Sequence, residues 1–108
     1  DKIKVDINIT VDKNMYLILP LALQLIIENA IKHNSMSKKN PLTIKIFVDE
    51  QLMLNIINNL QERESHMIST GVGLKNISHR YDLLELPAPE FIKTETQFVA
   101  KIPLKAKE

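Results

Sequence analysis

Alternation of apolar and polar residues predicts β-strands in several parts of this 108-residue chain. Residues 3–11 alternate strictly, so we expect a half-buried strand there. Residues 42–48 and 52–57 alternate as well, and the polar run 49–51 between them predicts that they form a hairpin. A last hairpin is predicted around residues 95–96.

Apolar residues spaced three and four apart predict two helices. The first begins near Pro20, because proline suits a first helical turn, and ends at about residue 33 or 34. The second covers about residues 72–84, after which Pro87-Ala88-Pro89 imposes an extended connection. The order of elements predicts an α+β fold: a two-layer sandwich whose mixed sheet is covered on one face by two helices.

Polar residues flank the apolar stripe of the first predicted helix, at Glu28, Asn29, Lys32 and His33. Glu28 and Lys32 are four residues apart, and so are Asn29 and His33, so each pair stacks one helical turn above the other. One interpretation of Glu28 and Lys32 is an ordinary surface ion pair, worth a few tenths of a kcal/mol. The other is a functional site along this flank of the helix.

The literal string favours the functional site. Residues 23–34 read Leu-Gln-Leu-Ile-Ile-Glu-Asn-Ala-Ile-Lys-His-Asn, which closely resembles the N-box of sensor histidine kinases, most nearly the LytS-like group. This group belongs to the superfamily of gyrase-type, MutL-type and heat-shock-chaperone ATPases. The resemblance implies a Bergerat-type fold with an ATP site on the inner face of this helix. It implies that Asn29 binds Mg²⁺ through its amide oxygen and that Glu28 is catalytic, orienting or deprotonating a water or acceptor. Lys32 and His33 would then lie near the phosphates.

A second motif surrounds Gly71 and Gly73, the only glycines in the chain, where a loop leads into the second predicted helix. Glycine lets backbone N–H groups approach a phosphate, and a helix N-terminus favours anions. Residues 71–81 resemble the second glycine box of LytS-like kinases, whereas an isolated Gly-x-Gly could equally be a plain turn. The resemblance implies that ATP phosphates are wrapped by the backbone amides of Gly71, Val72, Gly73 and Leu74. Asn76 and Arg80 are further phosphate candidates, with a solvated helix face as the alternative.

A third position departs from the family. Where these kinases have Asp-x-Gly-x-Gly, with an Asp that accepts a hydrogen bond from the adenine amino group, this chain has Asn58, Leu60 and Glu62. The period of two carries Asn58 onto the face of Leu54 and Ile56, and its carbonyl can still accept one hydrogen bond. Because the charge assistance is lost, we expect adenine binding to be weaker by about 1–2 kcal/mol. The alternative is a turn without an adenine contact, in a pseudokinase-type interaction domain with a degenerate nucleotide site.

Composition narrows the function classes. Apolar residues make up 44% and charged residues 25% of the chain, as in ordinary soluble proteins. The net charge of +1 gives no reason to expect nucleic-acid binding or direct membrane contact, and the lack of cysteine excludes disulfides and thiolate chemistry. The chain opens within a strand pattern, so we expect residues 1–108 to be one catalytic domain of a longer protein. By the resemblance, that protein is a membrane-anchored bacterial sensor with this domain in the cytoplasm.

The resemblance implies a protein-histidine kinase domain that binds Mg-ATP and donates the γ-phosphoryl group to a histidine on a separate dimerisation and phosphoacceptor domain. A downstream response regulator would be served through that domain. His33, His66 and His79 all lack the proline-histidine-phenylalanine context of the family's acceptor, so we expect no acceptor in this chain. Residues 61–70 correspond to the family's ATP lid, with an ordinary surface loop as the alternative. An anti-sigma-type serine kinase shares the same boxes and is the closest rival within the superfamily.

Overall fold

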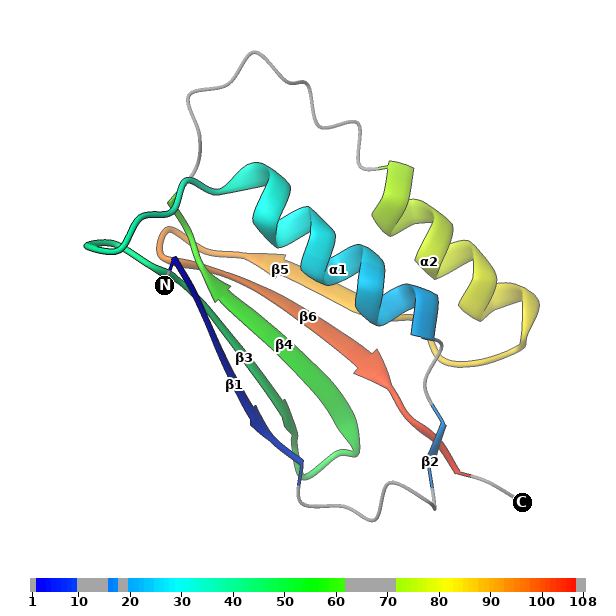
Figure 1. The fold of residues 1–108 in the computed structure, drawn as a ribbon. Helices are drawn as coiled ribbons and strands as arrows, with labels where there is room; N and C mark the ends of the chain where they lie inside the picture. The colour runs from blue at the N-terminus through cyan, green and yellow to red at the C-terminus, as the bar shows by residue number, and fades with distance from the viewer. Residues whose placement is uncertain (1, 10–15, 18–19, 62–71, 107–108) are drawn as a thin grey trace.

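A mixed five-stranded sheet lies beneath two helices in the computed structural model, which describes residues 2–9, 16–17, 20–61 and 72–106 (Figure 1). Its strands lie in the order β1-β3-β4-β6-β5, with β1 parallel to β3 and every other neighbouring pair antiparallel. Their bounds are β1 Ile3–Asn8, β3 Leu42–Val48, β4 Met53–Asn59, β5 Glu90–Lys93 and β6 Gln97–Pro103. The α+β class and the mixed sheet are confirmed.

Both helices lie on the same face of the sheet, as expected (Figure 1). Helix α1 spans Pro20–His33 and helix α2 spans Val72–Leu83, so the boundaries predicted from Pro20 and from the second apolar stripe are correct within one or two residues. The two helices contact each other and run in opposite directions.

The core lies between this helix layer and the sheet. From α1, Ala22, Ile26 and Ala30 are buried at four-residue spacing, and from α2, Ile77 and Tyr81 are each 1% exposed. The sheet contributes its alternating positions, namely Leu42, Ile44, Ile46, Leu54, Ile56, Ala100 and Ile102. Full burial of an aliphatic side chain contributes about 1.5–3 kcal/mol, so this cluster is the main source of stability.

Strand β1 forms where the alternation predicts it, but the expectation of a half-buried strand is wrong. All of its side chains are exposed, and Ile3, Val5 and Ile7 keep 36%, 53% and 58% of their surface accessible. The reason is position: β1 is the edge strand beside β3, while both helices lie nearer the opposite edge of the sheet, over β4, β6 and β5 (Figure 1). Alternation identifies the two faces of a strand, but it does not reveal what covers them.

The β3–β4 turn is longer than the sequence indicates. Leu52 has a φ of 59° and precedes β4, although its apolar side chain had suggested a strand residue. The Asp49 carboxylate accepts hydrogen bonds from the N–H groups of Gln51 at 2.9 Å and Met53 at 3.0 Å. These bonds hold residues 49–52 in the turn that connects β3 to β4.

A second, two-stranded sheet was not predicted. Strand β2, Tyr16–Leu17, pairs antiparallel with β7, Lys105–Ala106. Two-residue strands are too short to produce a recognisable alternation. Within the described part of the chain, neither helix has the length and apolar character needed to cross a membrane.

Candidate functional site

Helix α1 carries the N-box residues, but they do not line its inner face. That face is apolar, formed by Ala22, Ile26 and Ala30. Glu28 and Lys32 are exposed, because a residue two positions from a buried one lies about 200° around the helix. Both side chains are thus solvent-accessible, and their place in a nucleotide site stays a prediction.

Among the four predicted N-box residues, Asn29 and His33 are less exposed than Glu28 and Lys32. Both are half-buried, one turn apart, on a flank of α1 between its buried and exposed sides. The Glu28 carboxylate accepts a hydrogen bond of 3.0 Å from the Gln24 amide, one turn earlier on the exposed side. The four predicted residues thus divide into a half-buried pair, Asn29 and His33, and an exposed pair, Glu28 and Lys32.

Asn58 lies on the helix-facing side of β4, as the two-residue period predicts. It pairs with Ile44 of β3 and Phe98 of β6, and it is 3% exposed. Its Nδ2 group donates a hydrogen bond of 2.9 Å to the carbonyl oxygen of Asn59. This bond fixes the amide orientation, so its Oδ1 is the atom available as an acceptor toward the helix layer.

Helix α2 begins at Val72, so the first predicted phosphate contacts are backbone groups at a helix N-terminus. The opening N–H groups of a helix have no acceptor within it and carry partial positive charge. The first turn of α2 has no acidic side chain that could neutralise this charge. Gly71 lies outside the described residues, and the side chains of the helical residues Val72 and Gly73 are not described. For the glycine motif, the structure therefore describes the backbone from Val72 onward, at the start of α2.

The remaining α2 candidates differ in exposure. Leu74 is half-buried and packs against the hydrophobic core, as its place in the apolar stripe requires. Asn76 and Arg80 are both exposed and stand one turn apart on the same side of α2. Leu84, at which the predicted second helix ends, follows the end of α2 and is 53% exposed.

These segments share one face of the sheet. Helix α1 with Asn29, helix α2 and strand β4 with Asn58 come from three separate parts of the sequence, yet both helices lie on the face of the sheet to which Asn58 belongs (Figure 1). Among the described residues, no three His, Cys, Asp or Glu side chains gather to hold a metal. A Mg²⁺ ion with few protein ligands suits this donor set, because magnesium keeps several waters and takes its other oxygens from phosphates.

Sequence reasoning missed a junction between Asn34 and Gln61. Asn34 is 2% exposed; its Nδ2 donates to the carbonyl of Ala30 at 2.8 Å, and its Oδ1 accepts from the backbone N–H of Gln61 at 2.7 Å. The Gln61 carbonyl in turn accepts from the N–H of Ser35 at 2.8 Å. The Gln61 side-chain amide donates to the carbonyl oxygens of Ser35, Asn40 and Pro41 at 3.1–3.3 Å. The end of α1 is therefore tied to the chain just beyond β4.

A weak signal for this junction exists in the sequence. Asparagine directly after a helix often caps its C-terminus, and Asn34 follows His33, the last residue of α1. The partner Gln61 is 27 residues away in sequence and no local pattern identifies it.

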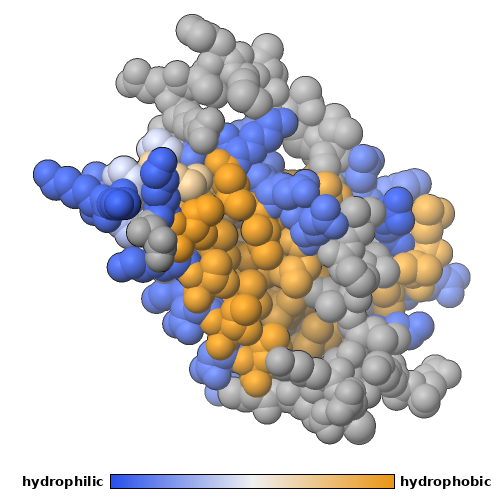
Figure 2. Space-filling model, viewed as in Figure 1, coloured by the Kyte–Doolittle hydropathy of each residue, from blue (hydrophilic) through white to orange (hydrophobic). Residues whose placement is uncertain are grey.

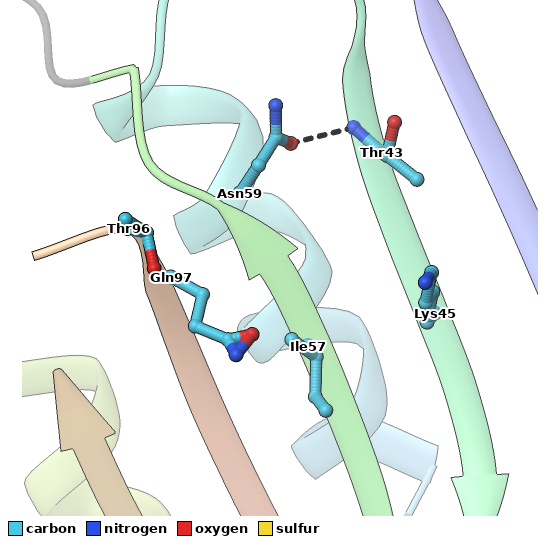
Figure 3. Close-up of a pocket in the computed structure, with 6 residues that line it drawn as sticks. All are labelled: Thr43, Lys45, Ile57, Asn59, Thr96 and Gln97. Carbon is cyan, nitrogen blue, oxygen red and sulfur yellow. Dashed lines mark hydrogen bonds between the residues drawn. The ribbon is translucent and has the colours of Figure 1, made fainter. Parts of the chain in front are cut away.

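The described part of the chain also has a pocket on the other face of the sheet, away from the helices (Figure 3). Its volume is about 250 Å³, and it is lined by Thr43, Lys45, Ile57, Asn59, Thr96 and Gln97. The Asn59 amide is already engaged, since its Oδ1 accepts from the N–H of Thr43 at 2.7 Å and its Nδ2 donates to Pro41 at 3.3 Å. The Asn59 side chain therefore ties β4 to β3, and its carboxamide is committed to the structure of the sheet.

The Asp49 carboxylate is the one described group with a defined electrostatic perturbation. The side-chain amide of Asn55, at 2.9 Å, and the backbone N–H of Met53 hold the pKa of Asp49 below its ordinary value. These bonds belong to the β3–β4 turn, so the perturbation marks a structural carboxylate.

Comparison of the chain with protein-family models, curated proteins and solved structures found no match.

Proposed function

We propose that this chain is the ATP-binding catalytic domain of a LytS-like sensor histidine kinase with a Bergerat-type fold. The observation that carries the proposal is the common location of three motif segments: the N-box helix α1, the β4 end at Asn58 and the N-terminus of α2 share one face of one sheet. The mixed sheet with two helices on one side is compatible with that fold. The proposal thus rests on motif and architecture together.

At the phosphate end, the chain supplies backbone donors and cations. The opening N–H groups of α2 would bind phosphate oxygens, since a helix N-terminus favours anions and no acidic side chain opposes them here. Asn76 is exposed one turn inside that terminus and would contact a phosphate there, whereas Arg80 lies in the last turn of α2, away from the N-terminus. Asn29 would hold Mg²⁺ through its amide oxygen, with Lys32 and His33 near the phosphates. Mg²⁺ neutralises charge that develops on the phosphoryl oxygens during transfer.

At the adenine end, Asn58 would accept a hydrogen bond from the adenine amino group through Oδ1, because its Nδ2 already donates to Asn59. Burial at 3% exposure strengthens such a bond relative to water, whereas the missing negative charge weakens it. The expected net effect is affinity lower by about 1–2 kcal/mol than an aspartate would give.

The transfer step requires a second domain. The γ-phosphoryl group would pass to an imidazole nitrogen of an acceptor histidine on the separate dimerisation domain, with ADP as the leaving group. Glu28 is exposed and hence accessible to such a domain, and it would orient the acceptor or take its proton. We therefore expect the isolated chain to bind nucleotide without phosphorylating itself; stable phosphohistidine on it would contradict this assignment.

The decisive test is titration calorimetry of the chain with a non-hydrolysable ATP analogue, with and without Mg²⁺. The proposal predicts Mg²⁺-dependent binding that Asn29→Ala abolishes and that Asn40→Ala, the same kind of change at an exposed loop residue, leaves intact. Asn58→Asp should tighten binding roughly tenfold, because it restores the charged acceptor. Unchanged affinity in Asn29→Ala would exclude the metal role of Asn29.

One observation favours the second candidate, a pseudokinase-type interaction domain. The Asn58 amide is engaged with the backbone of the next residue, and Leu60 stands where the family has its first glycine of this box. In that case the chain would show no binding up to millimolar nucleotide, and Asn58→Asp would not restore it.

A further inference from the structure

The outer edge of β1 presents an apolar row without cover from the described chain. Ile3, Val5 and Ile7 pair in register with the buried Leu42, Ile44 and Ile46 of β3, so they extend the helix-facing side of the sheet. Figure 2 shows hydrophobic atoms gathered on this side of the molecule, where Figure 1 draws β1 and β3 beside the helix layer. Within the described residues, β1 has one neighbouring strand, β3.

The hydrogen-bond register determines which backbone groups of β1 point outward. The Lys2 carbonyl accepts from the N–H of Leu42 at 2.8 Å, and Ile3 is the register partner of Leu42. In a parallel pair this pattern directs the backbone groups of even-numbered residues toward β3. The N–H and C=O groups of Ile3, Val5 and Ile7 therefore point to the open edge, ready to pair with another strand.

We propose that a second copy of this chain pairs with β1 in antiparallel orientation, about a two-fold axis at Val5. Val5 then faces Val5 of the second copy, and Ile3 faces its Ile7. All of these residues have outward backbone groups, so each is a hydrogen-bonded pair that exchanges both N–H···O bonds. The two sheets become continuous. The exposed apolar side chains of the two β1 strands then lie side by side on the same face and shield one another from solvent.

The charges on β1 select this register among the possible ones. Lys4 of each copy faces Asp6 of the other, in the non-hydrogen-bonded positions where side chains come closest. Shifting the pairing by two residues one way sets Lys4 against Lys4, although it also sets Lys2 against Asp6, and shifting it the other way sets Asp6 against Asp6. Of the three registers, the one about Val5 has opposite charges face to face without a like-charge pair. Charge complementarity therefore points to a second copy of this strand as the occupant of the edge.

The test is the molecular mass in solution, measured by sedimentation equilibrium over a range of protein concentrations. The chain should approach twice its mass of 12.4 kDa as concentration rises, and less readily at high salt because exposed ion pairs are screened. Lys4→Asp and Asp6→Lys should each shift the protein toward monomer. An equimolar mixture of the two variants should recover the dimer, because each reversed charge then faces its opposite.

Lys38→Asp, at an exposed loop residue, is the matched control and should dimerise like the unmodified chain. Lys4 and Asp6 are exposed, and far-UV circular dichroism checks that both variants stay folded. Lys4→Asp faces Thr43 within the sheet, so it introduces no like charge there, whereas Asp6→Lys faces Lys45. A chain that stays monomeric into the millimolar range overturns the proposal. So do single variants that dimerise normally, or a mixture that remains monomeric.

Discussion

Replacing Asn34 by alanine is expected to destabilise the protein by about 2–4 kcal/mol. The substitution removes the bond of 2.8 Å to the Ala30 carbonyl and the bond of 2.7 Å from the Gln61 N–H. Each of the two lost bonds costs about 0.5–1 kcal/mol, and the partners left without a hydrogen bond in a site 2% exposed add about 1–2 kcal/mol more. This is a large share of the 5–15 kcal/mol that typically stabilises a domain.

Urea unfolding followed by far-UV circular dichroism measures this change directly. The midpoint should fall while the slope m stays constant, since the surface exposed on unfolding is unchanged. Asn40→Ala is the control, because it makes the same truncation at an exposed residue of the adjoining loop and should change stability by less than about 0.5 kcal/mol. A loss below about 1 kcal/mol for Asn34→Ala would refute the view that this junction holds α1 to the end of β4.

Three further predictions concern the turns and the core. Glu85 lies two residues beyond the end of α2 with a φ of 58°, so Glu85→Gly should stabilise the protein by about 0.5–1 kcal/mol and raise its melting temperature; an unchanged or lower melting temperature would contradict the left-handed assignment. Because the folded-state pKa of Asp49 is lowered, the ionised carboxylate contributes to the free energy of unfolding at neutral pH. This contribution is lost as the pH falls through the folded-state pKa. The difference in melting temperature between the unmodified chain and Asp49→Ala should therefore shrink below about pH 4, and a constant difference would exclude the ionic contribution. Ile26→Ala, at a side chain 2% exposed, should cost about 2–5 kcal/mol in urea unfolding, whereas the exposed Ile92→Ala should cost far less.

Local patterns were sufficient to predict most of the elements, because the two helices and the β3–β4 and β5–β6 hairpins depend on contacts between near neighbours in sequence. Local patterns were insufficient where the structure depends on contacts between residues that are far apart in sequence. The exposure of β1 follows from where the helices settle on the sheet, and the Asn34–Gln61 junction joins residues 27 apart.

The candidate site shows the same division. Periodicity correctly assigned Asn58 to the helix-facing side of β4, since strand alternation is a local property. It did not separate exposed Glu28 from half-buried Asn29, because adjacent helical residues differ by only 100° and the width of the buried stripe depends on the packing partner. Leu52 was misassigned for another reason: leucine carries no signal for a positive φ.

The burial of Tyr81 has an optical consequence. The chain has no tryptophan and two tyrosines, so its near-ultraviolet absorption and emission come from very few rings. Tyr81 is 1% exposed on α2, and an immobile ring in an asymmetric apolar setting gives a near-ultraviolet circular dichroism band that a mobile, solvated ring lacks. Its spectrum therefore reports whether α2 is docked on the sheet, separately from the helical signal that both helices share, without any attached dye.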